Sequence, residues 1–400
     1  MPEPASRDAS ASVEPPPVVE SITLWDWDDD GVTLSQGPAP LESPAPSTTP
    51  VSPPGETEPV VLESAVLIER ARRGRRGAPE TDDTPVVAPR PVFRPRIVPG
   101  TDLSIFPVVL GGAPFGWTAS TEQSMAVLDA YAAAGGNALD TADSYSAGRS
   151  EVLIGTWLRE RGERERFVLS TKIGRRGDRP GLSAHSMIRA TEESLGRLQV
   201  ETIDVLYFHL DDPVVPLEES LTAADALVRS GKVRYIAASG YRPERMMEAR
   251  VMAGQLALPR FVGVQIDYNL VSRGAFEAEM SPVARAQELA VLASSSLARG
   301  FLGGGYRGRR QRAVAAPSRL TEMAQHMNKR GFRVLDALDS VAGEHGVPSA
   351  TAALAWLLTK PLITAPVASA STPAQVADLV GAAAVHLTRA QVSALDRASA

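Results

Sequence analysis

Cysteine is absent from this chain, and histidine is scarce, with 5 residues among 400. The lack of thiols excludes disulfides, thiolate zinc sites and a cysteine nucleophile, and it is compatible with a reducing compartment. The acidic run at 26–30 does not have the spacing of a calcium-binding loop, so we predict no metal site. The chemistry of the protein must therefore use other side chains.

Long hydrophobic runs are also missing, because Lys360 and Pro361 interrupt the best candidate. The first ten residues do not have the basic and apolar pattern of a signal peptide. The net charge of −6 does not favour binding to nucleic acid or to an anionic membrane, and 44% hydrophobic residues are enough for a large core. We therefore expect a cytoplasmic globular protein that binds neither nucleic acid nor membranes.

Residues 1–97 are rich in proline and serine and have little apolar surface to pack, so we predict a disordered N-terminal tail. Two segments stand out in it, an acidic one at 24–30 and an amphipathic one at 61–77 that ends in a basic cluster. Either segment would suit a protein partner, and the alternative is transient local structure in a solvated tail.

From residue 100 the pattern changes to short apolar runs that alternate with segments of helical period, which is typical of parallel strands joined by helices. Eight strand candidates begin at residues 106, 137, 167, 203, 233, 261, 290 and 362. Helical segments span 120–135, 151–162, 185–198, 217–231 and 243–254, and the first opens with a capping box from Ser120 to Gln123. No G-x-G-x-x-G motif follows the first strand, so we favour a closed α/β barrel, the (β/α)8 TIM barrel, over an open sheet for residues 98–400.

Four titratable residues stand at or just after three successive strand ends, and they are Asp140, Tyr145, Lys172 and His209. The C-terminal ends of the strands carry the active site in a TIM barrel, so these side chains are expected to converge. A tyrosine that donates a proton near neutral pH needs a cation beside it, and Lys172 can supply that charge. Asp140 would hold the ammonium, and His209 would orient a substrate oxygen. The set suits reduction of a carbonyl, and the alternative is a structural ion pair beside an ordinary core histidine.

The motifs around these residues resemble those of the aldo-keto reductase family. The segments "LDTADSY", "STKIG", "LYFHLDDP", "GKVRYIAASG", "VQIDYNLVSR" and "TPAQV" follow the family pattern in order and spacing over residues 98–400. The resemblance implies that Asp140, Tyr145, Lys172 and His209 are a catalytic tetrad with Tyr145 as the general acid. It also implies a small-molecule carbonyl substrate and a reduced nicotinamide cofactor, NADPH being expected and NADH the alternative.

The resemblance extends to cofactor contacts. It implies that Ser239 and Gln265 bind the nicotinamide carboxamide and that Asn269 belongs to the same site. Near the C-terminus, a capping box from Thr372 to Gln375 predicts a helix whose free N–H groups face a phosphate. Side-chain contacts from Ser371 and Gln375 are expected there as well.

The chain departs from the family pattern around the cofactor. Ser294, Ser295 and Ser296 stand where the family commonly has a stacking aromatic followed by Ser-Pro-Leu, and Gly305 replaces an expected lysine. Arginines 307, 309, 310 and 312 lie just downstream, where guanidinium groups would suit a phosphate.

Two other functions are compatible with these residues. One is a nucleotide-binding regulatory protein that resembles the family's channel-associated β subunits, with the tail engaging a partner and little turnover. The other is a barrel isomerase or lyase that uses Tyr145 and Lys172 for proton transfer without a nicotinamide.

Overall fold

The structure is a computed structural model in which residues 94–178, 180–304 and 323–400 are described. The chain divides into two units, 1–85 and 86–400, and all of the described residues belong to the second. The tail segments 24–30 and 61–77 lie outside the described residues, so their disorder and partner binding stay predictions. The first strand among the described residues begins at Arg96.

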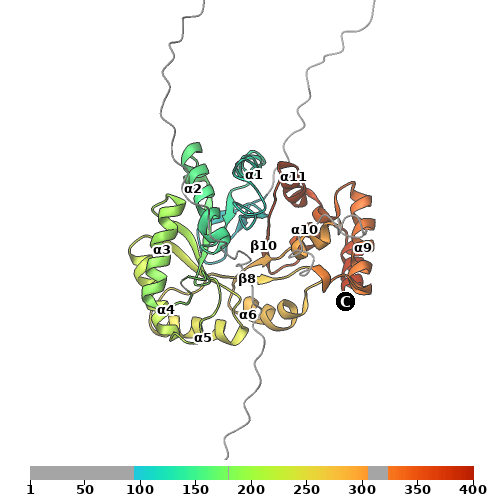
Figure 1. Ribbon diagram of the computed structural model, residues 1–400. Helices are drawn as coiled ribbons and strands as arrows, with labels where there is room; N and C mark the ends of the chain where they lie inside the picture. The colour runs from blue at the N-terminus through green and yellow to red at the C-terminus, as the bar shows by residue number, and fades with distance from the viewer. Residues whose placement is uncertain (1–93, 179, 305–322) are drawn as a thin grey trace, which may run out of the picture. The chain divides into compact units, whose positions relative to one another are not determined.

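Eight parallel strands close into a barrel in the order β10-β3-β4-β5-β6-β7-β8-β9 (Figure 1). The strands are β3 (Val109–Gly111), β4 (Ala138–Asp140), β5 (Val168–Ile173), β6 (Ile203–Phe208), β7 (Val233–Ser239), β8 (Gly263–Asp267), β9 (Ala290–Ser294) and β10 (Ile363–Ala368). Each strand overlaps one of the apolar runs identified in the sequence, and β5 extends one residue beyond its run, to Ile173. The prediction of a (β/α)8 TIM barrel is therefore confirmed.

Helices surround the strands (Figure 1). They are α1 (Thr121–Ala133), α2 (Arg149–Arg161), α3 (Ala184–Leu198), α4 (Leu217–Arg229), α5 (Pro243–Gln255), α6 (Ser281–Ala286), α9 (Lys329–His345), α10 (Ser349–Leu358), α11 (Pro373–Gly381) and α12 (Arg389–Ser399). Single turns are η1 (Tyr145–Gly148), η2 (Arg164–Arg166), η3 (Ala275–Met280), η4 (Ala298–Gly303) and η5 (Ala382–Ala384). Ser120 caps α1 with the predicted box, because its hydroxyl accepts from Gln123 N–H while the Gln123 side chain accepts from Ser120 N–H.

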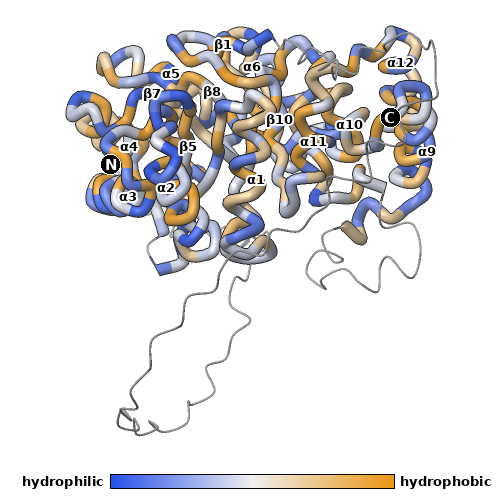
Figure 2. The backbone as a smooth tube through the Cα atoms, turned by 90° about the horizontal axis from the view of Figure 1, so that it is seen from above, coloured by the Kyte–Doolittle hydropathy of each residue, from blue (hydrophilic) through white to orange (hydrophobic). Residues whose placement is uncertain are grey.

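The core fills the space between the strands and the helices. Helix α10 is buried from Thr351 to Leu357, and much of it has the hydrophobic colour in Figure 2. Helices α2 and α3 approach so closely that a Cβ on Gly155 would collide with the carbonyl group of Leu198. This contact matters for function, because α2 follows directly after the turn that contains Tyr145.

A two-stranded antiparallel hairpin, β1 (Arg96–Ile97) and β2 (Ser104–Ile105), precedes the barrel and was not predicted. Its buried side chains Val98, Leu103 and Ile105 pack against residues at the N-terminal end of the barrel interior, such as Ala138 and Ala290, the first residues of β4 and β9. The hairpin is fastened by ion pairs, since Arg234 donates to Asp102 at 2.7 Å and to Asp204 at 2.6 Å. It covers the N-terminal end of the barrel and leaves the C-terminal end for the site.

Candidate active site

Asp140 and Lys172 form a buried ion pair where the second and third barrel strands end. Lys172 Nζ lies 2.5 Å from Asp140 Oδ2 and donates to the Thr141 carbonyl at 3.0 Å. The exposed fractions are 0% for Lys172 and 2% for Asp140. The other carboxylate oxygen, Asp140 Oδ1, accepts from Ser170 Oγ at 3.0 Å and from Gln265 Nε2 at 3.3 Å. The carboxylate is therefore fixed from three sides and in turn fixes the ammonium.

Lys172 stays charged in this environment. Burial by itself disfavours the ammonium, but the Asp140 carboxylate and the Tyr145 hydroxyl outweigh it and raise the pKa of Lys172 above its ordinary value. Lys172 Nζ lies 5.2 Å from the centre of the Tyr145 ring. A fixed positive charge therefore stands beside the phenol, where it can stabilise negative charge on the phenolic oxygen.

The turn that contains Tyr145 is strained. Ser146 and Ala147 have left-handed φ angles of 51° and 55°, a region that residues with a Cβ rarely adopt. Gly148 follows at φ 91°, and a Cβ there would lie 2.8 Å from Arg197 Cδ. Ser146 Oγ donates to the Phe115 carbonyl at 3.0 Å, which ties the turn to the loop after β3. These contacts hold Tyr145 over the barrel mouth in spite of the strain.

His209 follows the end of β6 and faces Tyr145, with ring centroids 6.1 Å apart and planes at 81°. Burial, together with the nearby charges of Lys172 and Arg175, lowers the pKa of His209 well below its ordinary value, so its imidazole is neutral. The Nδ1 atom is buried and has no hydrogen-bond partner among the described residues. Nε2 is therefore the nitrogen available to a ligand, and we assign the imidazole proton to it.

Ser239 and Gln265 lie side by side, because they are register partners at the ends of β7 and β8. Gln265 is 4% exposed, and its amide donates to the Asp140 carboxylate. The pair expected to hold a carboxamide is thus next to the Asp140–Lys172 ion pair. This arrangement would place a flat polar ring against the tetrad.

Asn269 has a different environment. Its Oδ1 accepts from the N–H groups of Val271 and Ser272, both at 2.9 Å, and its Nδ2 donates to the Ser295 carbonyl at 2.9 Å. The side chain therefore organises the loop after β8 and joins it to the loop after β9. Its amide is engaged within the protein, so we propose an indirect role for Asn269 in positioning the site.

At the expected phosphate site, Thr372 caps α11 and Pro373 occupies its first turn. The Thr372 hydroxyl accepts from Gln375 N–H at 3.4 Å, but the Gln375 side chain accepts from Ser371 N–H at 2.8 Å instead of from Thr372. The reciprocal capping box was therefore wrong in its second half, because Gln375 reaches one residue further back. Pro373 has no N–H, the Gln375 N–H is bound by the Thr372 hydroxyl and the Val376 N–H donates to the Thr372 carbonyl at 3.4 Å, which leaves the Ala374 N–H as the first-turn donor suited to an anion. Gly305 and the four nearby arginines lie outside the part of the chain that is described.

Comparison with known proteins agrees with this geometry. The model of the Aldo/keto reductase family matches residues 107–400. The chain belongs to the aldo/keto reductase family. Among its relatives, an uncharacterized oxidoreductase of Bacillus subtilis, YrpG, is 32% identical over 72% of this chain and 90% of its own length. Norsolorinic acid reductase B of Aspergillus parasiticus is 30% identical over 76% of this chain and 83% of its own. A probable voltage-gated potassium channel subunit beta of Oryza sativa is 30% identical over 66% of this chain and 83% of its own length.

This aldo/keto reductase also has two neighbouring buried carboxylates, Asp143 and Glu151, which the sequence analysis did not identify. Glu151, on α2, is fully buried and bonded to Arg197 Nε at 2.7 Å and Thr171 Oγ1 at 2.6 Å. Asp143 lies beside it at 1% exposure, and its Oδ1 has no hydrogen-bond partner in the described part of the chain. Burial and the neighbouring Glu151 raise the pKa of Asp143 to about 7, against the weaker opposing effects of Arg197 and Arg176. The position of Asp143 between Asp140 and Tyr145 was the only sequence signal for this residue.

Replacing Asp143 by asparagine should stabilise the protein at pH 8 and change little at pH 4. Below pH 4 the carboxyl is protonated in both folded and unfolded chains. Between about pH 4 and pH 7 the unfolded chain ionises while the folded chain holds its proton, so wild-type stability falls as the pH rises. At about 1.4 kcal/mol per pKa unit, the upper limit of the gain at pH 8 is about 4 kcal/mol.

Urea unfolding of wild type and Asp143→Asn at several pH values measures this difference. Asp336→Asn is the matched control, since Asp336 is exposed on α9 and should show no comparable trend. If the difference in unfolding free energy between Asp143→Asn and wild type did not grow between pH 4 and pH 8, protonation of Asp143 in the folded protein would be contradicted.

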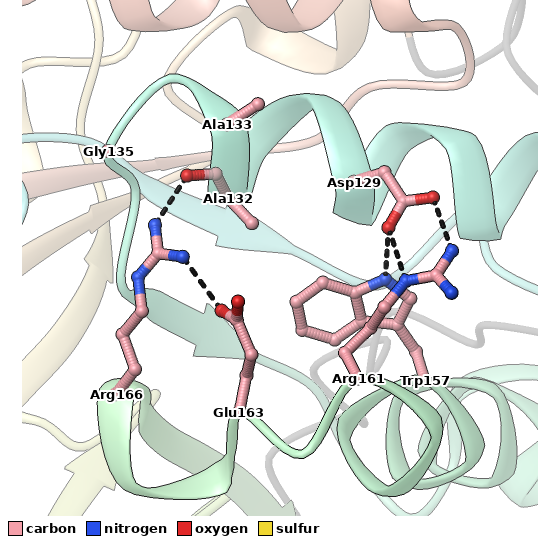
Figure 3. Close-up of a pocket in the computed structure, with 8 residues that line it drawn as sticks. All are labelled: Asp129, Ala132, Ala133, Gly135, Trp157, Arg161, Glu163 and Arg166. Atoms are coloured by element: carbon pink, nitrogen blue, oxygen red, sulfur yellow. Dashed lines mark hydrogen bonds and ion pairs between the residues drawn. The ribbon is translucent and has the colours of Figure 1, made fainter.

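A hollow of about 480 Å³ lies away from the tetrad (Figure 3). It sits between the C-terminal ends of α1 and α2, at the end of the barrel where the strands begin. Asp129 binds Arg161 and accepts from Trp157 Nε1 at 2.9 Å, while Arg166 binds Glu163 and the Ala132 carbonyl. Its polar groups satisfy one another, so the hollow has structural contacts and no sign of chemistry.

Among the described residues, no group of three or more His, Asp or Glu side chains is arranged to hold a metal ion. No helix among these residues is long and apolar enough to cross a membrane.

Proposed function

We propose that the protein reduces aldehydes or ketones to alcohols with a reduced nicotinamide cofactor, NADPH before NADH. The observation that carries this proposal is the buried Lys172 ammonium, paired with Asp140 at 2.5 Å and placed 5.2 Å from the centre of the Tyr145 ring. A fixed cation beside a half-buried phenol is the arrangement that proton donation to a carbonyl oxygen requires. The relative named norsolorinic acid reductase B supports reduction as the direction.

In the proposed reaction the Tyr145 hydroxyl donates its proton to the carbonyl oxygen as negative charge develops there. The Lys172 ammonium stabilises the phenolate that remains, and Asp140 keeps the ammonium paired and oriented. The neutral His209 donates from Nε2 to the same oxygen and so holds the carbonyl in place. A proton and a hydride together convert the carbonyl to an alcohol.

The residues at the barrel mouth fit a nicotinamide cofactor. Ser239 and the Gln265 amide offer hydrogen bonds for a carboxamide, and Gln265 already contacts Asp140. The N-terminus of α11 offers the Ala374 N–H to a phosphate, because Pro373 has no N–H and the Gln375 and Val376 N–H groups bind Thr372. Such a cofactor, when bound, would supply the hydride. Ser294 offers no stacking surface, because serine has no aromatic ring, so we expect the nicotinamide ring to be held mainly by hydrogen bonds. The Ser294 hydroxyl itself donates to Asp267 Oδ1 at 2.6 Å.

The test is the initial rate of NADPH and NADH oxidation with a panel of aldehydes and ketones, alongside cofactor binding followed by fluorescence. We expect both cofactors to bind and NADPH to support the faster turnover. Binding of neither cofactor would overturn the proposal and favour a nicotinamide-independent isomerase or lyase.

A second candidate is the regulatory function suggested by the relatives named as channel β subunits. It predicts that the full chain binds NADPH tightly and turns over no carbonyl in the panel. The complete set of Asp140, Tyr145, Lys172 and His209 favours the reductase, because a cofactor sensor has no need of a proton donor.

A further inference from the structure

Three large apolar side chains are exposed on loops at the barrel mouth. Trp117 is 62% exposed in the loop between β3 and α1, while Leu210 and Val214 are 42% and 87% exposed in the loop between β6 and α4. Both loops leave the C-terminal ends of barrel strands, the end at which the tetrad lies. Other exposed large apolar side chains lie on the hairpin, on outer helices or at a helix end, and these are Ile97, Val152, Ile188, Val251 and Leu256.

The loop with Trp117 is fastened to the turn with Tyr145. The carbonyl of Phe115 accepts from Ser146 Oγ at 3.0 Å. Gly116 packs so closely on α2 that a Cβ there would lie 2.9 Å from Arg149 Cβ. The backbone just before Trp117 is therefore held against the residues that flank Tyr145.

The loop with Leu210 and Val214 is fixed in a similar way on the other side of the tetrad. Leu210 directly follows His209, and its Cδ2 lies 3.0 Å from the place that a Cβ on Gly240 would take. The Asp212 carboxylate accepts from Val214 N–H at 3.0 Å and from Leu182 N–H at 2.8 Å, so it ties this loop to the one after β5. The Val214 side chain is thus exposed to solvent, while hydrogen bonds to Asp212 hold its backbone in place.

β3 and β6 are separated in the barrel by β4 and β5, so the two loops stand on either side of Tyr145 and Lys172. Small-molecule sites are lined mainly by apolar and aromatic side chains around a few polar groups, because removal of apolar surface from water stabilises the complex. We propose that Trp117, Leu210 and Val214 form the apolar rim of the substrate site, and that the preferred substrate is a carbonyl compound with a bulky, ring-containing apolar body. This inference rests on the proposed reductase function and selects among its substrates.

The experiment compares kcat/KM for 2-naphthaldehyde and for glyceraldehyde with saturating NADPH, using the full chain. Trp117→Ala should lower kcat/KM for 2-naphthaldehyde about 10- to 100-fold, mainly through KM, and change that for glyceraldehyde less than about 3-fold. Val214→Ser should show the same selectivity with a smaller loss. Trp117→Phe keeps an aromatic ring and should recover most of the naphthaldehyde activity.

Val251→Ala is the matched control, because Val251 is 51% exposed on α5 and should leave both substrates unaffected. Equal losses for both aldehydes in Trp117→Ala would overturn the inference, since they would show that Trp117 only supports the Tyr145 turn. Unchanged rates would overturn it too, and in both cases reduction itself would stand. Absence of turnover with every carbonyl despite bound NADPH is a separate outcome, which would overturn the reductase proposal together with this inference.

Discussion

Replacing Tyr145 by phenylalanine should lower kcat for carbonyl reduction by about 10²- to 10⁴-fold, the range that one general acid contributes. Phenylalanine keeps the ring that faces His209 and Lys172, so the packing around the site is retained. It removes the hydroxyl, and with it the proton that the carbonyl oxygen receives. Affinity for NADPH should change by no more than about 2-fold, because Tyr145 is not among the residues expected to hold the cofactor. Steady-state rates and a fluorescence titration measure the two quantities.

Tyr235→Phe is the matched control for the loss of a phenolic hydroxyl. The Tyr235 hydroxyl donates to Asp102 at 2.9 Å in the hairpin at the other end of the barrel. Its removal should change stability little, because the hydrogen bond is exposed to solvent, and should leave kcat unchanged. If Tyr145→Phe retained more than about a tenth of wild-type kcat, Tyr145 could not be the proton donor.

Lys172→Met should lower the free energy of unfolding by about 3–5 kcal/mol and abolish measurable reduction. Both members of the Asp140–Lys172 pair are buried, so removal of the ammonium leaves a carboxylate with only Ser170 and Gln265 as partners. The loss of activity follows from the loss of the charge beside Tyr145. Urea unfolding at pH 7 measures the stability, and NADPH oxidation measures the activity.

The double variant Asp140→Asn/Lys172→Met separates these effects. Without a buried carboxylate it should be more stable than Lys172→Met and equally inactive, because the cation is still missing. A Lys172→Met protein as stable as wild type would show that the buried pair is not ionised, and the role assigned to Lys172 would then fall.

The sequence alone determined the barrel and the placement of Asp140, Lys172 and His209 at its strand ends. Apolar runs and helical periods are local properties, and parallel strands joined by helices bring their C-terminal ends to one face whatever the details of packing. The same locality explains why the hairpin was missed, since strands of two residues, Arg96–Ile97 and Ser104–Ile105, are too short to show a period.

Only the tertiary structure decided how the side chains pair. The contact between Gln265 and Asp140 joins residues 125 positions apart, and that between Glu151 and Arg197 joins residues 46 apart. No periodicity in the sequence shows that Asp143 is buried next to Glu151. Nor does it show that the Asn269 amide is hydrogen-bonded to the loops after β8 and β9. Burial and charge pairing arise from barrel closure and from the packing of α2 and α3 over the loops. The sequence therefore determined which groups reach the site, and the packing decided their charge and their partners.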